Sequence, residues 1–277
     1  MSAAAPAAPM IPRLENVGRV TQARVILSEW TKLHSLRSTR WSLGVAVVLT
    51  IALPAIFAAV TKSHWAHMQP HERADRHPLD IALAGVNLSQ LAIGVLGVLV
   101  ITGEYATGMI RASFTAVPKR LPVLWAKIVV FAVVSFVLML PSVLIAFWVS
   151  QSILHSIPQL QTSLSAHGIL RSVVGGAVYL MLFGVFCMAM GAIVRNTAGG
   201  IAAFVALFFV IPPLLNVFPT SWQNAINPWI PNSSFRSIFQ LTHGSHSLSP
   251  AGGLAVSLGY VAFAVAVAAV LLVRRDT

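Results

Sequence analysis

Residues 123–150 read VLWAKIVVFAVVSFVLMLPSVLIAFWVS, and this stretch decides the fold class. A helix needs about 20 consecutive apolar residues to cross the hydrocarbon core of a bilayer. The stretch exceeds that length, and its single charged residue, Lys127, stands near its start. A lysine in that place can extend its ammonium group to the headgroup layer, which is called snorkelling. The sequence therefore predicts a membrane-spanning helix here.

Five further stretches have the same character, and their charged residues also lie near their ends, as Arg171 does. Pro54, Pro141 and the pair Pro212 and Pro213 fall inside spans, where we expect kinks whose freed carbonyls are satisfied by neighbouring helices. We therefore predict an all-α membrane protein with six transmembrane helices. The predicted spans are residues 41–61, 81–102, 123–150, 170–194, 198–218 and 251–273.

The composition of the 277-residue chain supports this class, because 57% of the residues are apolar and only 9% are charged. A soluble domain carries roughly 25% charged residues. The net charge of +11 comes from basic residues at the ends of apolar runs, where they meet anionic headgroups. No basic patch is interleaved with aromatic residues, so nucleic acid is not an expected partner. The lone Cys187 lies in an apolar run and is expected to be a small buried side chain.

The distribution of basic residues predicts the orientation of the spans, since cytoplasmic loops carry an excess of Lys and Arg. With the N-terminus inside, 13 of the 18 Lys and Arg residues fall on the cytoplasmic side. Both termini are therefore predicted to be cytoplasmic. The Ala/Pro-rich residues 1–19 are expected to form a disordered tail, and residues 20–277 a single transmembrane domain.

Residues 20–37, before the first span, show apolar side chains at helical spacing, with polar side chains largely on the opposite side. The segment has too few apolar residues to cross a bilayer. It is typical of an amphipathic helix that lies in the headgroup layer. The predicted apolar face consists of Ile26, Leu27, Trp30 and Leu33.

The loop between the second and third spans begins GEYATGMIR at residues 103–111. Glu104 stands at the edge of a span, where a charge is costly, so we expect it to have a cationic or backbone partner. Gly103 and Gly108 are expected to form turns, and Thr107 to cap a short helix over residues 108–116. That helix would either dock on a partner protein or serve only as a connector, and composition leaves both open.

Four segments, in this order, give the chain a resemblance to a known family: EWTKL (29–33), LRSTRW (36–41), GEYATGMIR (103–111) and GAIVRNTA (191–198). Together with the proline-broken segment before the last span, they resemble permease subunits of actinobacterial ABC transporters of the type-two exporter class. The resemblance covers residues 20–275.

The resemblance implies an N-terminal connecting helix at residues 20–37 and a coupling helix at residues 107–117 that docks on a separate ATPase. It implies two permease subunits, expected to be a homodimer, and two ATPase subunits that bind ATP and Mg. The implied function is export of an apolar or amphipathic compound (a drug, natural product or lipid) across the bacterial cytoplasmic membrane. Glu104 matches the acidic residue before the coupling helix in relatives and is expected to anchor the loop.

The chain contains no Gly-Lys-Ser or Gly-Lys-Thr, so a phosphate-binding P-loop is not expected, nor are catalytic residues or a cofactor of its own. ATP hydrolysis would belong to the partner subunit. The residues assigned to ATPase coupling are Glu104, Thr107, Gly108, Met109, Ile110, Arg111 and Phe114.

Three other functions were weighed. A sensor or immunity module on the same permease fold could have the same sequence. An ion-coupled secondary transporter usually buries charged groups at the membrane midplane and shows inverted repeats, and neither pattern is evident. An intramembrane zinc protease would need His-Glu-x-x-His, which is missing. His64, His67 and His71 have metal-ligand spacing if their segment is helical, but no cysteine accompanies them, so a neutral polar surface is expected and no metal site.

Overall fold

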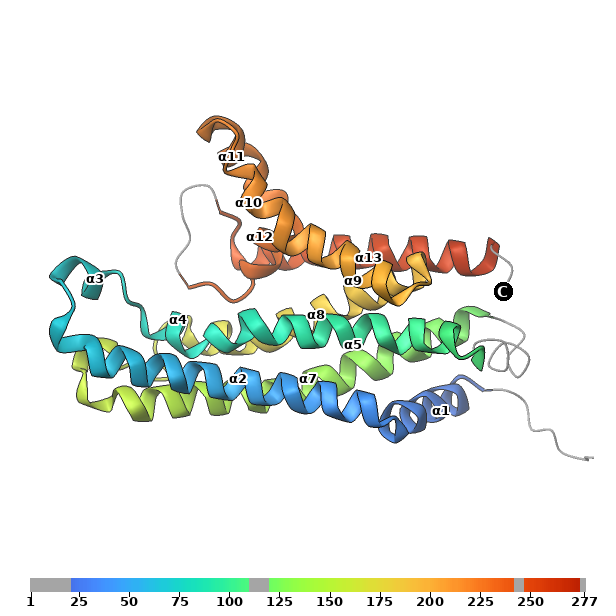
Figure 1. The fold of residues 1–277 in the computed structure, drawn as a ribbon, viewed down its shortest axis with the longest axis horizontal. Helices are drawn as coiled ribbons and strands as arrows, with labels where there is room; N and C mark the ends of the chain where they lie inside the picture. Colours follow the sequence, from blue (N-terminus) through green and yellow to red (C-terminus); the bar gives the residue numbers. More distant parts are fainter. Residues whose placement is uncertain (1–20, 110–119, 242–246, 275–277) are drawn as a thin grey trace, which may run out of the picture.

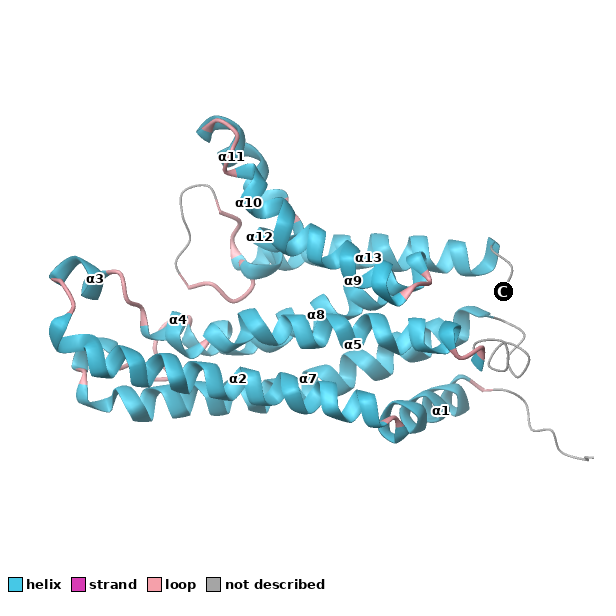
Figure 2. Ribbon diagram, in the orientation of Figure 1, coloured by secondary structure: helices cyan, strands magenta, loops and turns pink. Residues whose placement is uncertain are grey.

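The computed structural model describes residues 21–109, 120–241 and 247–274, and within these ranges the regular structure is helical, with no strand. Figure 2 shows the helices and the short loops that join them. The helices are α1 (Gln22–Ser35), α2 (Arg37–His64), η1 (Trp65–His67), α3 (Pro70–Ala74), α4 (Pro78–Ala82), α5 (Ala84–Ala106), α7 (Arg120–Ile153), η2 (Leu154–Ser156), η3 (Pro158–Leu160), α8 (Ile169–Val194), α9 (Thr197–Val205), η4 (Ala206–Val210), α10 (Ile211–Leu215), α11 (Thr220–Ile226), η5 (Asn227–Trp229), α12 (Pro231–Arg236) and α13 (Pro250–Arg274).

Six helical segments among the described residues are long and apolar enough to cross a membrane. They coincide with the six predicted spans, and the chain is an all-α multi-pass membrane protein. The third segment starts earlier than predicted, because α7 already begins at Arg120. The six segments are Arg37–His67, Pro78–Ala106, Leu121–Ser156, Ile169–Val194, Thr197–Leu215 and Pro250–Arg274.

Helix α8 is the central helix, since most of its side chains are buried against α5, α7 and α13. Glycines let its neighbours approach closely. A Cβ atom on Gly97 of α5 would lie 2.4 Å from the Gly184 carbonyl oxygen, and one on Gly184 would lie 2.6 Å from the Phe131 ring. Small residues at helix contacts allow this approach in membranes, where van der Waals packing holds helices together. Helices α5 and α8 therefore touch backbone to backbone.

Helix α2 continues through Pro54, as expected of a proline in a membrane span. Proline has no N–H group, so the Thr50 carbonyl one turn earlier loses its helical donor. Gly85 of α5 packs at this point: a Cβ on Gly85 would lie 2.4 Å from the Thr50 oxygen and 2.9 Å from Pro54 Cδ. The first turns of α5 therefore fit against the proline turn of α2.

The fifth span is irregular, because η4 (Ala206–Val210) is a π-helix between two short α-helices. Pro212 and Pro213 follow it after Ile211 and supply no backbone donors to the turn before them. A single π-helical turn is the usual form of such a helix and often marks a functional position. In Figure 1, α10 and α11 rise away from the bundle after this turn. The side chains of Val210 and Val217 are exposed, as expected of a surface that faces lipid.

Aromatic side chains hold the π-helix to the rest of the molecule. The Phe208 ring of η4 lies 4.8 Å from the Phe183 ring of α8 and 5.5 Å from the Phe235 ring of α12, centroid to centroid, and both pairs are edge-on. Edge-on aromatic pairs add to the stabilisation from burial. The buried Tyr179 hydroxyl next to them donates a hydrogen bond to the Gln90 side chain of α5.

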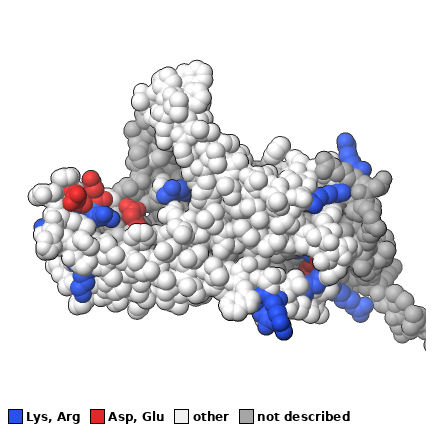
Figure 3. Space-filling model, viewed as in Figure 1, with Lys and Arg blue, Asp and Glu red and all other residues white. Residues whose placement is uncertain are grey.

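The two ends of the bundle differ in surface charge (Figure 3). We call the end that holds α1 and the last turn of α13 the α1 end, and the opposite end, with α3, the α3 end (Figure 1). Arginines are exposed at the α1 end, including Arg24, Arg37 and Arg274, whereas at the α3 end the acidic Glu72 and Asp75 are exposed beside basic side chains.

Candidate functional site

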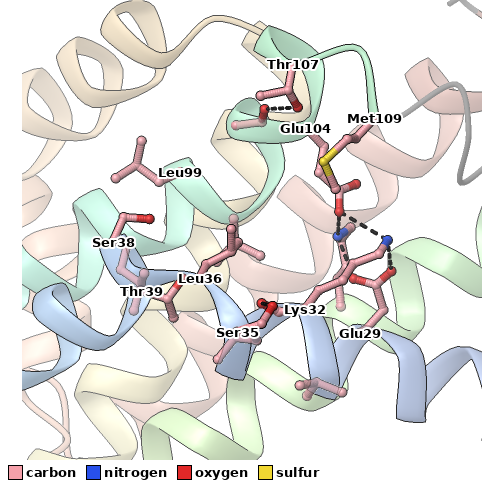
Figure 4. Close-up of a pocket in the computed structure, with 16 residues that line it drawn as sticks. Glu29, Lys32, Ser35, Leu36, Ser38, Thr39, Leu99, Glu104, Thr107 and Met109 are labelled. Carbon is pink, nitrogen blue, oxygen red and sulfur yellow. Dashed lines mark hydrogen bonds and ion pairs between the residues drawn. The ribbon is translucent and has the colours of Figure 1, made fainter.

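Four charged side chains meet inside the α1 end of the bundle. Glu29 and Lys32 come from α1, Glu104 from the last turn of α5, and Lys127 from the second turn of α7. Figure 4 shows Glu29 and Lys32 facing Glu104 across the gap between the two helices. We call these four residues the charge cluster. The nitrogen–oxygen distances are 2.6 Å for Lys127–Glu29, 2.6 Å for Lys127–Glu104, 2.8 Å for Lys32–Glu29 and 3.3 Å for Lys32–Glu104.

The expectation that Lys127 snorkels to the headgroup layer is wrong. Helix α7 begins at Arg120, so Lys127 lies two turns inside it, and its side chain is only 5% exposed. The ammonium instead bridges carboxylates from two other helices. A charge that leaves water needs ionic partners and hydrogen bonds in good geometry. Glu29 and Glu104 supply both, which makes burial more favourable than extension toward the surface.

The charge cluster is electrically balanced, with two ammonium groups and two carboxylates. Removing one member of a buried ion pair typically costs 3–5 kcal/mol, because an uncompensated charge remains. The cluster joins α1 to α5 and α7 over long sequence separations, and Lys127 is 98 residues from Glu29. It therefore fixes α1 against the ends of the two helices that enter and leave the loop at residues 107–119.

Glu104 has the cationic partner expected of it, since Lys127 and Lys32 both donate to its Oε1. Its second oxygen, Oε2, is buried and has no hydrogen-bond partner among the described residues. A buried acceptor without a donor loses the solvation it has in water and gains nothing in return. Oε1 of Glu104 thus accepts hydrogen bonds, and its Oε2 accepts none from the described residues.

Lys32 lies outside the predicted spans, and its surroundings shift the pKa of its ammonium group. Burial lowers its pKa, but the hydrogen bond and charge of Glu29, with those of Glu104, outweigh burial and raise the pKa above its ordinary value. Lys32 therefore stays protonated at physiological pH and keeps the cluster in balance.

A cavity of about 300 Å³ adjoins the charge cluster (Figure 4). Its lining combines apolar side chains, hydroxyl groups and all four members of the charge cluster. The apolar members are Leu33, Leu36, Leu96, Leu99, Val100, Met109 and Val130, and the hydroxyl-bearing ones are Ser35, Ser38, Thr39 and Thr107.

The assigned coupling residues lie directly after the cluster, and only the first of them are described. Gly103 does not form a turn as expected, because it lies inside α5. Gly108 does, with φ of +71°, the left-handed region that favours glycine. The Thr107 hydroxyl donates back to the Gly103 carbonyl at 2.9 Å. Met109 is exposed at the start of the loop. Ile110, Arg111, Phe114 and the rest of the predicted coupling helix lie outside the described residues.

A helix is present where the sequence predicts the interfacial one, as α1, and its predicted apolar face is divided between the bundle and the outside. Leu33 is buried, yet Leu27 is 64% exposed and Trp30 is 48% exposed. The face turned toward the bundle carries Val25 and Glu29 beside Leu33, with Ile26 partly buried at its edge. On the side that faces the bundle, Glu29 forms its ion pair with Lys127. Leu27 and Trp30 then face outward, as residues that contact lipid headgroups do.

Arg195 ties together three helix ends near the charge cluster. It lies just after α8, with φ of +57°, a left-handed conformation that is uncommon for a residue other than glycine. Its guanidinium lies 5.2 Å from the Tyr105 ring of α5, and its Nη2 donates to the Leu271 carbonyl of α13 at 3.2 Å. The sequence indicates Arg195 only as a basic residue in a resembling segment, and it does not predict the contacts of Arg195 with Tyr105 and Leu271.

The three candidate metal ligands fall in three different helices: His64 ends α2, His67 ends η1 and His71 lies in α3. The single helical face that their spacing required does not form. Within the described ranges, no three His, Cys, Asp or Glu residues are grouped so that they could hold a metal ion.

No protein-family model matches the chain, and no curated protein matches it. The class of the protein is therefore defined only by its fold and by this site. It is a multi-pass helical membrane protein in which a buried charge cluster of zero net charge holds α1 against α5 and α7.

Proposed function

We propose that this chain is the membrane-spanning permease subunit of a bacterial ATP-driven exporter of the type-two ABC class. In this proposal the loop at residues 107–119 docks on a separate ATPase, and two copies of the chain pair in the cytoplasmic membrane. The cargo is an apolar or amphipathic compound. The α1 end of the bundle, and with it both termini, faces the cytoplasm.

The observation that carries the proposal is the charge cluster. A loop that receives force from a partner must be joined stiffly to the spans on both of its sides. Glu104 lies three residues before the loop, and Lys127 lies on the helix that follows it, 2.6 Å away. Glu29 adds α1 to the same unit. A displacement of the loop would thus move α1, α5 and α7 together.

The surface charge supports the orientation in this proposal. The arginines exposed at the α1 end are typical of a cytoplasmic face. The exposed acidic side chains at the α3 end fit the opposite side, where basic residues are fewer.

The position of the buried charges favours an exporter driven by a partner over an ion-coupled transporter. Ion-coupled transporters hold their ionisable groups near the midplane, where the ions bind. Glu104 and Lys127 lie near the ends of α5 and α7, and they neutralise one another. These charges therefore connect helices to one another and do not form an ion-binding site at the midplane.

The test is reconstitution of the chain with a P-loop ATPase, which is to be sought among the products of the neighbouring genes. Inside-out vesicles that hold both proteins should accumulate a fluorescent apolar compound when ATP is added. Vesicles with an ATPase whose P-loop lysine is replaced by alanine are the control and should not accumulate it. Transport or hydrolysis by the purified chain alone would contradict the proposal.

The same preparation separates an exporter from a sensor or immunity module on the same fold. An exporter couples its two activities, so that transported compounds raise the rate of ATP hydrolysis. A sensor would bind its ligand without accumulating it in the vesicles.

A further inference from the structure

The cavity beside the charge cluster opens at the joint between α1 and α2. Three of its lining residues at this joint, Ser35, Leu36 and Ser38, are exposed. Its inner wall includes Leu96 and Leu99 of α5. The volume of about 300 Å³ lies at the lower end of the range for small-molecule sites, which are mostly apolar with a few polar groups. An alkyl chain that enters at the joint can therefore lie along α5.

Two hydroxyl groups in the lining have no hydrogen-bond partner among the described residues. Ser35 donates to the Lys32 carbonyl oxygen at 3.0 Å, but Ser38 and Thr39 form no side-chain hydrogen bond of this kind. Thr39 is only 3% exposed, and buried hydroxyl groups are nearly always hydrogen-bonded. Figure 4 shows the Ser38 hydroxyl directed into the space beside Leu99. A hydrogen-bond acceptor in the cavity would give both hydroxyl groups a partner.

The mouth of the cavity carries a positive charge. Arg37 and Arg40 are exposed at the start of α2, and Arg40 lies one helical turn after Leu36, which lines the mouth. The carboxylates of Glu29 and Glu104 are buried and already paired with lysines in the charge cluster, whose net charge is zero. Neither arginine forms an ion pair with a described carboxylate. The head of a ligand at the mouth is therefore expected to be anionic.

Two tryptophans mark the depth of the mouth in the bilayer. Trp30 and Trp41 lie on either side of the joint, and their side chains are 48% and 76% exposed. Exposed tryptophans of membrane proteins gather in the headgroup layer. The planar guanidinium group of arginine matches the geometry of phosphate oxygens. The mouth thus lies at the level of the lipid phosphates, and the cavity at the level of the ester groups and the first part of an acyl chain.

We propose that this cavity binds a glycerophospholipid with an anionic head. The phosphate lies beside Arg37 and Arg40, the ester carbonyls accept hydrogen bonds from Ser38 and Thr39, and one acyl chain lies along α5. Basic pockets between membrane-spanning helices are a known type of site for anionic lipid heads. The inference concerns lipid binding alone and does not depend on the proposed transport function, so the two can fail separately.

The test measures protection of a thiol in the cavity. The full chain carries Cys187→Ala, which removes its one cysteine, and Leu99→Cys, which places a thiol in the lining. The detergent-solubilised protein is incubated with dioleoyl phosphatidylglycerol, dioleoyl phosphatidylcholine or glycerol phosphate, and the rate of labelling by N-ethylmaleimide is followed. Leu91→Cys, which is exposed on the same helix and lies outside the lining, is the matched control.

We expect phosphatidylglycerol to slow labelling of the Leu99→Cys thiol about tenfold more than phosphatidylcholine, because only phosphatidylglycerol has a net negative head. Both lipids should affect the Leu91→Cys thiol equally, which excludes a general effect of micelle charge on the labelling reaction. Glycerol phosphate should protect neither thiol, since it has no acyl chain to occupy the cavity.

Arginine variants test the assignment of the head. Arg37→Gln with Arg40→Gln should lower the protection by phosphatidylglycerol to that by phosphatidylcholine, because the guanidinium groups that bind the phosphate are lost. Arg24→Gln with Arg274→Gln is the charge-matched control. It removes two exposed arginines from the same end of the bundle, outside the lining, and should leave the protection unchanged.

Ser38→Ala with Thr39→Val tests the assignment of the ester groups and should weaken protection by both lipids, because both carry ester carbonyls. Equal protection of the Leu99→Cys thiol by the two lipids would overturn the inference. Protection by glycerol phosphate would identify a site for free anions in place of a lipid site. A preference for phosphatidylglycerol that survives the Arg37 and Arg40 changes, or full protection without the two hydroxyl groups, would mean that these side chains do not bind the lipid.

Discussion

The ammonium of Lys127 on α7 lies 2.6 Å from the Oε2 of Glu29 on α1, although 98 residues separate them in sequence. Both side chains are 5% exposed. The pre-span helix is thus attached to the bundle by a buried ion pair, whereas a helix held only by an apolar face could roll along the membrane surface.

Replacing Lys127 with methionine should lower the free energy of unfolding by about 3–5 kcal/mol, because two carboxylates are left buried without their main partner. The measurement is thermal unfolding of the purified protein in detergent. Lys62→Met is the matched control, since Lys62 is exposed at the end of α2, and its melting temperature should match that of the unchanged protein. Equal melting temperatures for the two variants would mean that the cluster does not stabilise the fold.

Under the proposed function, Glu104→Gln should reduce ATP-driven export while the protein still inserts and melts cooperatively. The amide keeps the size of the side chain but loses the charge that holds Lys127, so the loop and the spans move less strictly together. Coupling free energies of this kind correspond to a 5- to 150-fold effect, and we expect about tenfold. Export and ATP hydrolysis are measured together. Glu72→Gln, an exposed carboxylate at the α3 end, should change neither.

Arg111→Ala should also uncouple hydrolysis from export if the loop docks as proposed. Arg111 lies outside the described residues, so this prediction derives from the sequence resemblance alone. Unchanged export in both the Glu104 and the Arg111 variants would remove the coupling assignment.

Gly97→Ala should destabilise the protein strongly, because a Cβ there would lie 2.4 Å from the Gly184 carbonyl, where neither backbone can yield easily. Gly103→Ala is the control on the same helix, as no atom lies within 4 Å of its Cβ position. Alanine is favoured over glycine in a helix by about 1 kcal/mol, so this second variant should be neutral or more stable. Yield and melting temperature distinguish the two. Similar behaviour would argue against the close contact of α5 and α8.

Stability should fall at alkaline pH through Lys32. Its pKa in the folded protein is raised above 10.5, so the folded state holds this proton more tightly than the unfolded chain. The stabilisation is complete below 10.5 and is lost as the pH rises through the higher folded value. Melting temperatures between pH 9 and 12 should therefore fall more steeply for the unchanged protein than for Lys32→Met. If the melting temperatures of the two proteins fell in parallel with rising pH, Lys32 would contribute no pH-dependent stabilisation.

The six spans could be predicted because each is a long apolar run, and its recognition requires no information about the helices that pack against it. The π-helical turn was not predicted, although Pro212 and Pro213 indicated an irregularity near it. How a helix relieves a missing donor depends on what packs against it, here the rings of Phe183 and Phe235 on Phe208. Local sequence carries no such information.

The charge cluster was predicted only in part. Glu104 and Lys127 both stood out as charges at the edges of apolar runs, and opposite charges in such places need partners. The sequence did not indicate that each was the partner of the other, or that Glu29 completed the set. Helical periodicity placed Leu27 and Trp30 on the apolar face expected at the headgroup layer, but it did not indicate that the carboxylate of Glu29 points into the bundle.

The backbone contact of Gly97 with Gly184 limits how the molecule can change shape. Two helices that touch without intervening side chains cannot slide past one another, so α5 and α8 behave as one rigid body. Any opening of a pathway must then occur elsewhere. The stretch after η4 holds Pro212 and Pro213, which donate no backbone hydrogen bonds, and a swing of α10 and α11 about it would leave the packed half undisturbed.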